Sequence, residues 1–236
     1  INDNIHAVYF DKDNYLWLGV FQGGLNRLKN KPLFDLATHN PEDPENTLPQ
    51  KSILSIFPIQ NQQILIGTDG GGLCVWDTKN NTFKTIRAGK SGLKSDIIRS
   101  VYQGYDKKIW IGTYQSGLQL YNHDTKTFTT YQNNPSDSTS LSHNDVTAII
   151  EDRLGNLWIA TNGGGLNLMD KKTGTFKRFV KEDNNPNSLI NNWITKLYLD
   201  KRGYLWIGTF WGLSRLDPLR YEFKNIELTN SNTYYC

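Results

Sequence analysis

Residues suited to acid–base or metal chemistry are scattered along this chain of 236 residues. The four histidines are His6, His39, His123 and His143. They share no spacing that would pair them as metal ligands. Three aspartates, Asp69, Asp96 and Asp145, could act as acid or base groups, but no two are set at a defined separation. No cofactor and no metal site is predicted.

Two short motifs resemble ligand-binding loops without their full pattern. The run Asp11-Lys12-Asp13-Asn14 begins like a calcium loop but lacks the later glycine and glutamate, which favours a tight hairpin. The glycine runs at 70–72 and 163–165 lie between two expected strands, whereas phosphate-binding glycines lie between a strand and a helix. Both motifs are therefore interpreted as structural.

Aromatic and amide side chains are better candidates, and the chemistry they favour is binding. Sugar CH faces stack on aromatic rings, while sugar hydroxyls require fixed donors and acceptors. The candidate ligand-binding residues are Phe21, Arg99, Tyr114, Asn162, Trp193, Phe210 and Trp211, and the flanking polar residues are His6, Asn144 and Asn192. The alternative is that some of these aromatic residues pack against their own loops or a neighbouring domain.

The elements that must position these residues repeat five times. A box of the type Leu-Trp-Ile-Gly starts at residues 16, 64, 109, 157 and 205, and each box is followed by a Gly-Leu pair and then a phenylalanine. A period of about 45 residues made of short β-branched and aromatic runs is typical of propeller blades. The sequence therefore predicts an all-β propeller of five four-stranded blades.

The fourth repeat shows the expected blade most clearly. Its strands are predicted at 146–150, 157–161, 166–169 and 176–179, separated by glycine-containing turns. The repeats run approximately over 1–40, 41–88, 89–133, 134–181 and 182–228, which predicts one propeller domain over 1–228 and a polar C-terminal tail over 229–236.

Positions that repeat are expected to carry the fold, and positions that vary are candidates for function. Trp17, Trp110, Trp158 and Trp206 recur at one phase and are predicted to fill the wedge between blades. Variation is concentrated in the turn after each box and in the segments that connect blades, for example 134–137 and 185–188. Propeller topology places both sets of loops on one face, where binding loops are usual.

Composition limits the classes of function. The net charge of +3 is spread without a basic stripe, so no nucleic acid is expected to bind. No run approaches 18 apolar residues, and no export signal is expected within these residues. A disulfide between Cys74 and Cys236 stays open, although neither has the spacing of a disulfide framework.

The repeat resembles the two-component regulator propeller repeat. The resemblance rests on the segments 152–161 and 200–209, each reading Asp-x-x-Gly-x-Leu-Trp-Ile-(Gly or Ala)-Thr, and on the Gly-Leu pairs that follow. Repeats one and three have Asn14 and Lys107 in place of the turn glycine, and repeat two has Leu65 in place of tryptophan. The family's ligand-binding residues have no motif that can be mapped onto this sequence.

The resemblance implies a function and a setting. The repeat is similar to those in the sensor region of hybrid two-component systems of polysaccharide-degrading gut bacteria. The chain would then be a periplasmic, ligand-sensing propeller of an inner-membrane protein. It would bind an oligosaccharide from polysaccharide breakdown and signal to a histidine kinase outside the chain, without being an enzyme itself. Implied partners are further propeller, sandwich and kinase domains of the same protein, and a homodimer is left open.

Two other functions are retained as alternatives, a protein-interaction scaffold and a propeller lyase or glycosidase.

The sequence also leaves two possibilities for how the five blades are arranged, a closed ring or part of a larger ring. Five blades can close a ring, but the resemblance implies seven. The chain begins at an inner strand near Ile5 and ends after an outer strand at Phe223, which favours five blades of a larger ring. An open ring would expose the apolar strands at 5–9 and 194–198.

Overall fold

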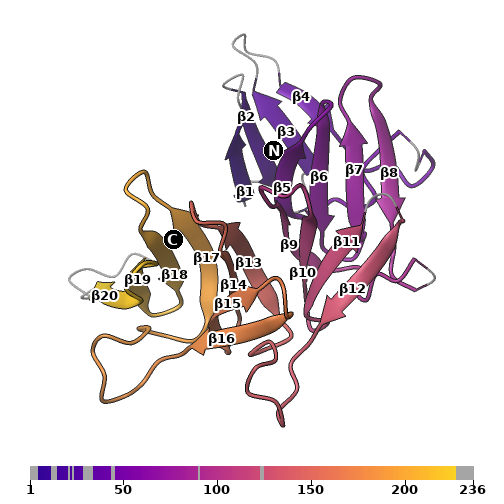
Figure 1. Cartoon of the computed structure of the whole chain (residues 1–236). Coiled ribbons are helices and arrows are strands. Elements are labelled where there is room, and N and C mark those ends of the chain that lie inside the picture. Colours follow the sequence, from indigo (N-terminus) through magenta and orange to yellow (C-terminus); the bar gives the residue numbers. More distant parts are fainter. Residues whose placement is uncertain are drawn as a thin grey trace. The chain divides into compact units, whose positions relative to one another are not determined.

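The chain folds into five antiparallel sheets of four strands each (Figure 1). The computed structural model describes residues 5–11, 15–20, 22, 24–28, 34–43, 46–89, 91–122 and 125–226. Its strands are β1 (Ile5–Phe10), β2 (Leu16–Val20), β3 (Gly24–Leu28), β4 (Phe34–Ala37), β5 (Ile53–Ile59), β6 (Gln63–Thr68), β7 (Leu73–Asp77), β8 (Thr82–Ile86), β9 (Ile98–Gln103), β10 (Ile109–Thr113), β11 (Leu118–Asn122), β12 (Thr127–Tyr131), β13 (Val146–Glu151), β14 (Leu157–Thr161), β15 (Gly165–Asp170), β16 (Thr175–Phe179), β17 (Ile194–Leu199), β18 (Leu205–Thr209), β19 (Gly212–Asp217) and β20 (Glu222–Ile226).

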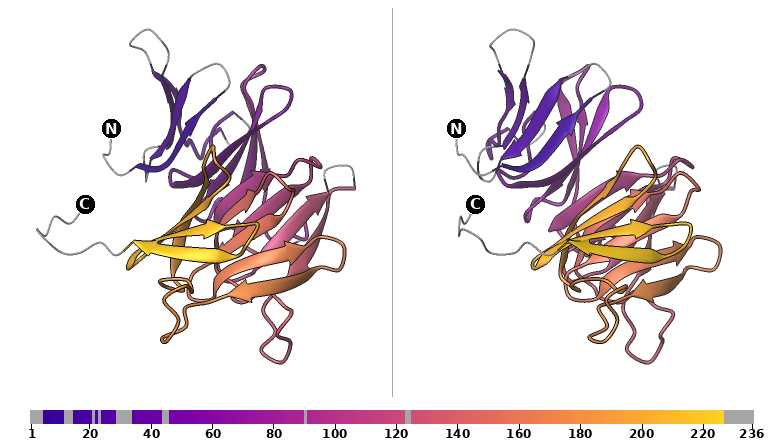
Figure 2. Two further views of the ribbon diagram at one scale, coloured as in Figure 1. Left: turned by 60° about the vertical axis from the view of Figure 1, so that its left-hand side comes forward. Right: turned by 90° about the vertical axis from the view of Figure 1, so that its left-hand side faces the viewer.

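Each sheet is a simple meander in which strands pair in the order in which they occur in the chain. The further views in Figure 2 show the twist of the strands within each sheet. One sheet corresponds to one sequence repeat, so the five sheets are called blades 1 to 5 in chain order. The predicted fold class, an all-β propeller of four-stranded blades, is confirmed.

The chain divides into two compact units. The first consists of Ile1–Tyr131 with Asn144–Val146, and it contains blades 1 to 3. The second consists of Gln132–His143 with Thr147–Cys236, and it contains blades 4 and 5 apart from the first residue of β13. The prediction of one domain over 1–228 stays a prediction.

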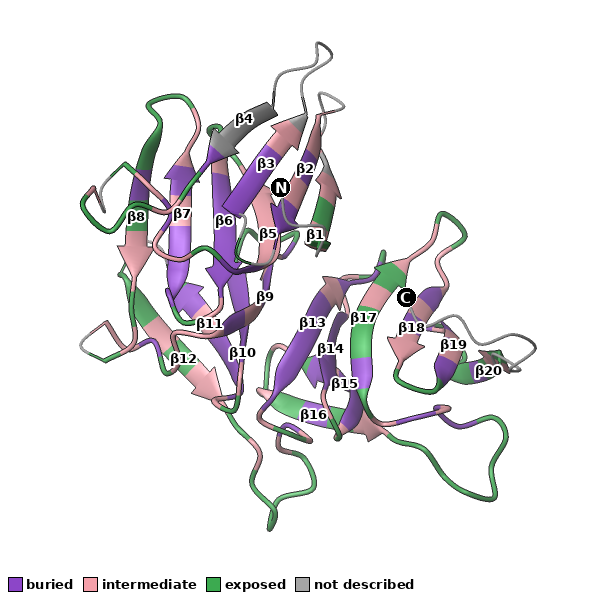
Figure 3. Cartoon of the chain, turned by 180° about the vertical axis from the view of Figure 1, so that it is seen from behind, coloured by how far each residue is buried: buried purple, intermediate pink, exposed green. Residues whose placement is uncertain are grey.

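The apolar core lies between neighbouring blades within each unit. One buried cluster joins Trp17 of blade 1 to Ile53 and Trp76 of blade 2, and another joins Trp158 of blade 4 to Ile207 of blade 5. Every residue of β10 and of β14 is buried, as expected for strands covered on both faces (Figure 3). The side chain of Trp17 is 3% exposed, those of Trp110 and Trp158 are 1% and 0% exposed, and Trp206 is half-buried. The predicted wedge role of the box tryptophans is confirmed.

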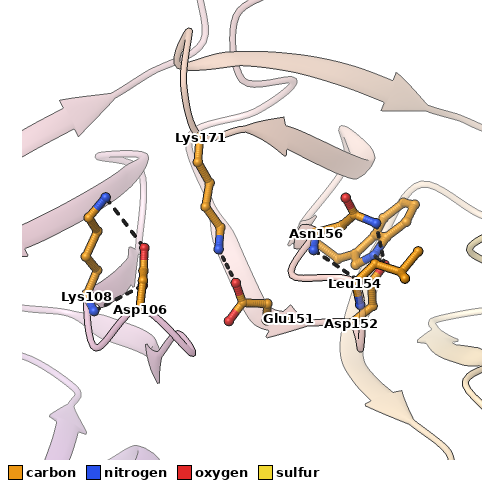
Figure 4. Close-up of polar contacts among 8 residues, drawn as sticks. Asp106, Lys108, Glu151, Asp152, Leu154, Asn156 and Lys171 are labelled. Atoms are coloured by element: carbon orange, nitrogen blue, oxygen red, sulfur yellow. Dashed lines mark hydrogen bonds and ion pairs between the residues drawn. The ribbon is translucent and has the colours of Figure 1, made fainter.

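An aspartate six residues before the tryptophan fixes the indole in three blades. The indole Nε1 donates a hydrogen bond to this carboxylate in the pairs Trp17–Asp11 (2.8 Å), Trp158–Asp152 (2.9 Å) and Trp206–Asp200 (2.9 Å). Asp152 also accepts hydrogen bonds from the backbone of Leu154 and from Asn156 (Figure 4). The aspartate of the Asp-x-x-Gly turn therefore both closes the hairpin and satisfies the polar end of a buried ring.

Blades 2 and 3 change this pair in different ways. Blade 2 replaces both partners with apolar residues, Ile59 and Leu65, so this pair of positions has no side-chain polar atom that needs a hydrogen bond. Blade 3 keeps Trp110 but has Gly104 in the aspartate position, and the buried indole Nε1 has no hydrogen-bond partner among the described residues. Losing one partner of a buried pair costs more than replacing both, so blade 3 carries a local defect.

The Gly-Leu pairs join each blade to the next. The glycine N–H donates to the carbonyl oxygen of the second residue before the next inner strand, in the pairs Gly24–Lys51 (3.0 Å), Gly72–Asp96 (2.8 Å), Gly117–Asn144 (2.8 Å) and Gly165–Asn192 (3.0 Å). At Gly165 φ is +76°, and a Cβ atom would lie 2.4 Å from the carbonyl oxygen of Phe179. Only glycine fits here, so these glycines are structural, as the sequence predicted.

Candidate functional site

Four of the predicted site residues lie at the junction of blades 4 and 5. Asn162, directly after the box strand β14, forms an antiparallel bridge with Trp193, which directly precedes the inner strand β17. The backbone N–H of Phe210 donates a hydrogen bond of 3.1 Å to the carbonyl oxygen of Trp193. Trp211 follows Phe210, and its N–H donates to Thr209 Oγ1 at 3.3 Å. Asn162, Trp193, Phe210 and Trp211 are called the blade 5 aromatic cluster.

The rings of this cluster are unusually exposed for their size. Trp193 is 49% exposed, Phe210 66% and Trp211 72%, whereas the box tryptophans Trp110 and Trp158 are almost fully buried. The backbone of each residue is held by hydrogen bonds, so the rings project from a fixed frame. Neighbouring exposed rings beside an amide suit a ligand that stacks on aromatic faces and also needs hydrogen bonds.

A second group lies in the first unit and is built around Arg99. The guanidinium Nε of Arg99 lies 3.0 Å from Asp145 Oδ1, and the carboxylate is buried while the arginine side chain is 35% exposed. The guanidinium carbon lies 5.1 Å from the centre of the Tyr114 ring, a cation–π distance. Gln115 donates a hydrogen bond of 3.0 Å to the Tyr114 hydroxyl. Arg99, Tyr114 and Asp145 are called the Arg99 group.

The other predicted residues have different outcomes. Phe21 lies outside the described residues. Asn192 Oδ1 accepts a hydrogen bond of 2.7 Å from the backbone N–H of Lys181, and Asp96 Oδ1 accepts one of 2.7 Å from Ala88. Both side chains thereby tie an outer strand to the next blade, which is a structural role. His6 and Asn144 are half-buried.

The connecting segments carry a repeated structure that the sequence did not reveal. Asn134 and Asn185 each begin a tight turn in which the side-chain oxygen accepts the backbone N–H two residues later, at 3.1 and 3.0 Å. Ser140 and Ser188 close the two turns by accepting a backbone N–H six residues earlier. These local hydrogen bonds fix the shape of each segment, so we interpret the Asn-Pro starts as structural.

Ion pairs also lie outside these groups among the described residues. Glu151 pairs with Lys171, and Asp106 pairs with Lys108 at 3.5 Å (Figure 4). Within the described ranges, no three histidine, cysteine or acidic side chains are grouped as metal ligands. No helix long and apolar enough for a membrane span occurs in the same ranges.

Cys74 is a free, buried thiol in β7. Burial raises its pKa to about 12, and a hydrogen bond with Thr85 opposes that shift. The thiolate is the reactive form, so Cys74 is interpreted as a core residue. Cys236 lies outside the described residues.

Fold and site together define a β-propeller with an exposed aromatic cluster on its inter-strand loops. Four segments match the family model described as the two-component regulator propeller, at residues 1–22, 92–115, 140–163 and 188–211. These four segments are similar to the two-component regulator propeller repeat, which is the resemblance that the sequence motifs predicted. Repeat 2, in which Ile59 and Leu65 replace the Asp–Trp pair, contains none of the four matched segments.

This chain is also similar to known proteins in sequence and in structure. Histidine kinase P4 of Formosa agariphila is 39% identical over 155 residues, which cover 62% of this chain and 11% of that protein. The extracellular domains of two proteins from B. thetaiotaomicron described as hybrid two-component systems superpose with TM-scores of 0.78. They are 22% and 18% identical to this chain, and the match covers 96% and 97% of it.

These proteins are much longer than this chain. The chain spans about a tenth of the histidine kinase and 30% and 31% of the two solved extracellular domains. Virginiamycin B lyase from Staphylococcus aureus also superposes, with a TM-score of 0.68 at 10% identity, over 97% of this chain and 71% of the lyase. At that identity the lyase shares the fold alone.

Proposed function

We propose that this chain is the ligand-sensing propeller of a hybrid two-component system and that it binds an oligosaccharide through the blade 5 aromatic cluster. The observation that carries the proposal is the exposure of Trp193, Phe210 and Trp211 on loops joined by backbone hydrogen bonds. Exposed rings of this size are costly to leave in water without a function. Binding would signal to a histidine kinase domain outside this chain.

The Arg99 group supplies a second type of contact in the proposal. Its guanidinium is held by Asp145 on one side and by the Tyr114 ring, so its direction is fixed before a ligand arrives. No acceptor for the two terminal nitrogens is found among the described residues. A preorganised arginine loses little conformational freedom when it donates to sugar hydroxyls.

The relatives support a proposal about where this chain is located. The matched regions of the two B. thetaiotaomicron proteins are extracellular domains. We propose that this chain is likewise extracytoplasmic, in the periplasm, and that further propeller, sandwich and kinase domains accompany it. A homodimer is compatible with this arrangement.

A panel of neutral and acidic oligosaccharides tests the proposal against its alternatives. We expect saturable binding by isothermal titration calorimetry, with no new reducing ends or unsaturated products after prolonged incubation. Turnover of any member of the panel would assign the chain to the lyase or glycosidase class. Neither binding nor turnover across the panel would contradict the sensor proposal and favour a protein-interaction scaffold.

Substitutions then locate the site. Trp193→Ala and Trp211→Ala are expected to weaken binding about tenfold or more each, because one stacked ring contributes about 1 to 3 kcal/mol. Tyr105→Ala is the matched control, since Tyr105 is 63% exposed and lies in the β9–β10 turn of the other unit. Equal loss in all three variants would contradict a site at the blade 5 aromatic cluster.

A further inference from the structure

The turn between β5 and β6 departs from the family pattern in a way that the fold does not require. Repeats 4 and 5 have Arg153-Leu154-Gly155 and Lys201-Arg202-Gly203 after the turn aspartate, whereas repeat 2 has Gln60-Asn61-Gln62 and then Gln63. The backbone of this turn is satisfied, since Thr78 donates from its N–H and its hydroxyl to the Gln62 carbonyl oxygen at 2.9 and 2.8 Å.

The amide side chains of this turn make no hydrogen bonds to other described residues. Gln60, Asn61 and Gln62 are exposed and Gln63 is half-buried, and none of their side-chain amides has a hydrogen-bond partner among the described residues. Asn61 and Gln62 have φ angles of +62° and +60°, which glycine adopts more easily. Blade 2 therefore carries amide side chains at two positions with positive φ.

These amides form the wall between two hollows of the first unit. A hollow of about 490 Å³ lies toward blade 1 and one of about 480 Å³ toward blade 3. Both are lined by Gln60, Asn61 and Gln63 and by Gln103 of β9. Each volume is within the range of small-molecule sites, and the shared wall would let one extended ligand contact both.

Blade 1 supplies aromatic surface opposite the amides. The first hollow is lined by Tyr9, Tyr15 and Arg27, and the guanidinium carbon lies 5.2 Å from the Tyr15 ring centre and 5.1 Å from that of Trp17. Burial, followed by the charge of Asp11, raises the pKa of Tyr9, so its hydroxyl stays a hydrogen-bond donor at neutral pH. Asp11 and Arg27 carry opposite charges, so the lining of the first hollow has no net charge, whereas the second hollow is lined by Asp106, Lys107 and Lys108.

This combination selects a class of ligand. Each amide offers a donor and an acceptor, as sugar hydroxyls require. An apolar ligand would strip water from the amides without replacing the hydrogen bonds, which costs free energy. An anion would face the Asp11 carboxylate and the amide oxygens. A neutral polyhydroxylated ligand can exchange hydrogen bonds with the amides and with Tyr9 and Tyr15 in the first hollow without placing a charge beside Asp11 or Arg27.

We propose that the Gln60–Gln63 turn, with Tyr9 and Tyr15, is a second binding site, specific for a neutral oligosaccharide. It lies in the first unit, and none of its residues belongs to the blade 5 aromatic cluster. It therefore does not require that the proposed function be correct.

Removing the amides while keeping the turn tests this site. In the variant Gln60→Ala/Asn61→Gly/Gln62→Gly, glycine retains the positive φ angles, so the protein is expected to fold. Lys126→Gly is the matched control, because Lys126 is exposed and has a φ of +56° in the β11–β12 turn. The probes are the neutral hexasaccharides of cellulose, xylan, mannan and starch and a hexa-uronate of matched length.

The readout is the set of side-chain amide signals in ¹H–¹⁵N spectra, assigned to residues. With at least one neutral hexasaccharide we expect saturable shifts at Gln60–Gln63 in the wild type, in Lys126→Gly and in Trp193→Ala/Trp211→Ala. The turn variant should lose about tenfold or more in affinity at the backbone signals of this turn.

Three results would overturn the second site. They are shifts confined to the blade 5 aromatic cluster, shifts at the turn that survive removal of the amides, and tighter binding of the hexa-uronate at the turn. The first of these leaves the proposed function intact. Loss of shifts at the cluster with shifts retained at the turn would overturn the proposed function and support the second site.

Discussion

At the scale of single residues, one chemical type has two separate uses in this chain. Tryptophans at the repeated box position fill the space between blades, and Trp17 and Trp158 donate their indole N–H groups to turn aspartates. Trp193 and Trp211 are outside that pattern and project into solvent. The phase of a tryptophan within the repeat therefore distinguishes these buried rings from the exposed ones.

The first prediction concerns the box. Trp158→Ala should lower the free energy of unfolding by about 3 to 5 kcal/mol, because it removes a fully buried ring and its polar contact. Urea denaturation measures the loss. Trp211→Ala is the matched control and should change stability by less than about 0.5 kcal/mol. A comparable loss in both variants would assign Trp211 to packing.

The second prediction repairs the defect in blade 3. Gly104→Asp should stabilise the protein by about 1 kcal/mol, because an aspartate at this position can accept the buried Trp110 Nε1 hydrogen bond. Gly104→Ala controls for the added Cβ atom. In a Trp110→Phe background the aspartate should give no gain. A gain that persists there would show that the hydrogen bond is not its source.

The third prediction concerns pH. The hydrogen bond from the Trp206 indole, with further backbone N–H donors, holds the pKa of Asp200 below its usual 3.8. A lowered pKa contributes stability above the unfolded value and loses it as pH falls through the folded value. The stability difference between wild type and Asp200→Ala should therefore be constant near neutrality and shrink below pH 3.8. A difference that is unchanged in acid would contradict this account.

At the scale of elements, the strands could be predicted from the sequence, whereas the contacts within and between the loops could not. The period of the boxes placed all five blades, because a strand sandwiched between blades constrains residue type at every position. The pairing of Arg99 with Asp145 was not predicted, since two residues in different repeats meet only through the fold. The self-closed turns at Asn134 and Asn185 were also missed, because their hydrogen bonds are local and leave little trace in composition.

The Gln60–Gln63 turn could have been found from the sequence. Repeat 2 has Ile59-Gln60-Asn61-Gln62 in place of the recurrent Asp-x-x-Gly pattern, and a fourth amide, Gln63, follows directly. The hollows beside it depend on side-chain packing from three blades. A repeat pattern shows which residues differ, and the structure is needed to show which of them share a cavity.

At the scale of the whole molecule, closure of the blades stays a prediction. The family resemblance favours five blades of a larger ring, which would leave the inner strands of the outer blades uncovered. Val8 of β1 is 60% exposed and Tyr198 of β17 is 62% exposed. Exposed apolar strands promote association.

We therefore expect the isolated chain to self-associate, with a mass by light scattering that rises with protein concentration. Val8→Lys/Tyr198→Lys should reduce that association. Leu154→Lys is the control, because Leu154 is 66% exposed in the β13–β14 turn and is not on an inner strand. A constant monomer mass for the wild type would contradict the open-ring prediction.

The central claim is that the blade 5 aromatic cluster binds an oligosaccharide, and the indole ¹H–¹⁵N signals test it most directly. The chain has seven tryptophans. With an oligosaccharide that binds by calorimetry, the signals of Trp193 and Trp211 should shift saturably, while those of the buried Trp110 and Trp158 stay fixed. Saturable binding that leaves the Trp193 and Trp211 signals unchanged would contradict the claim.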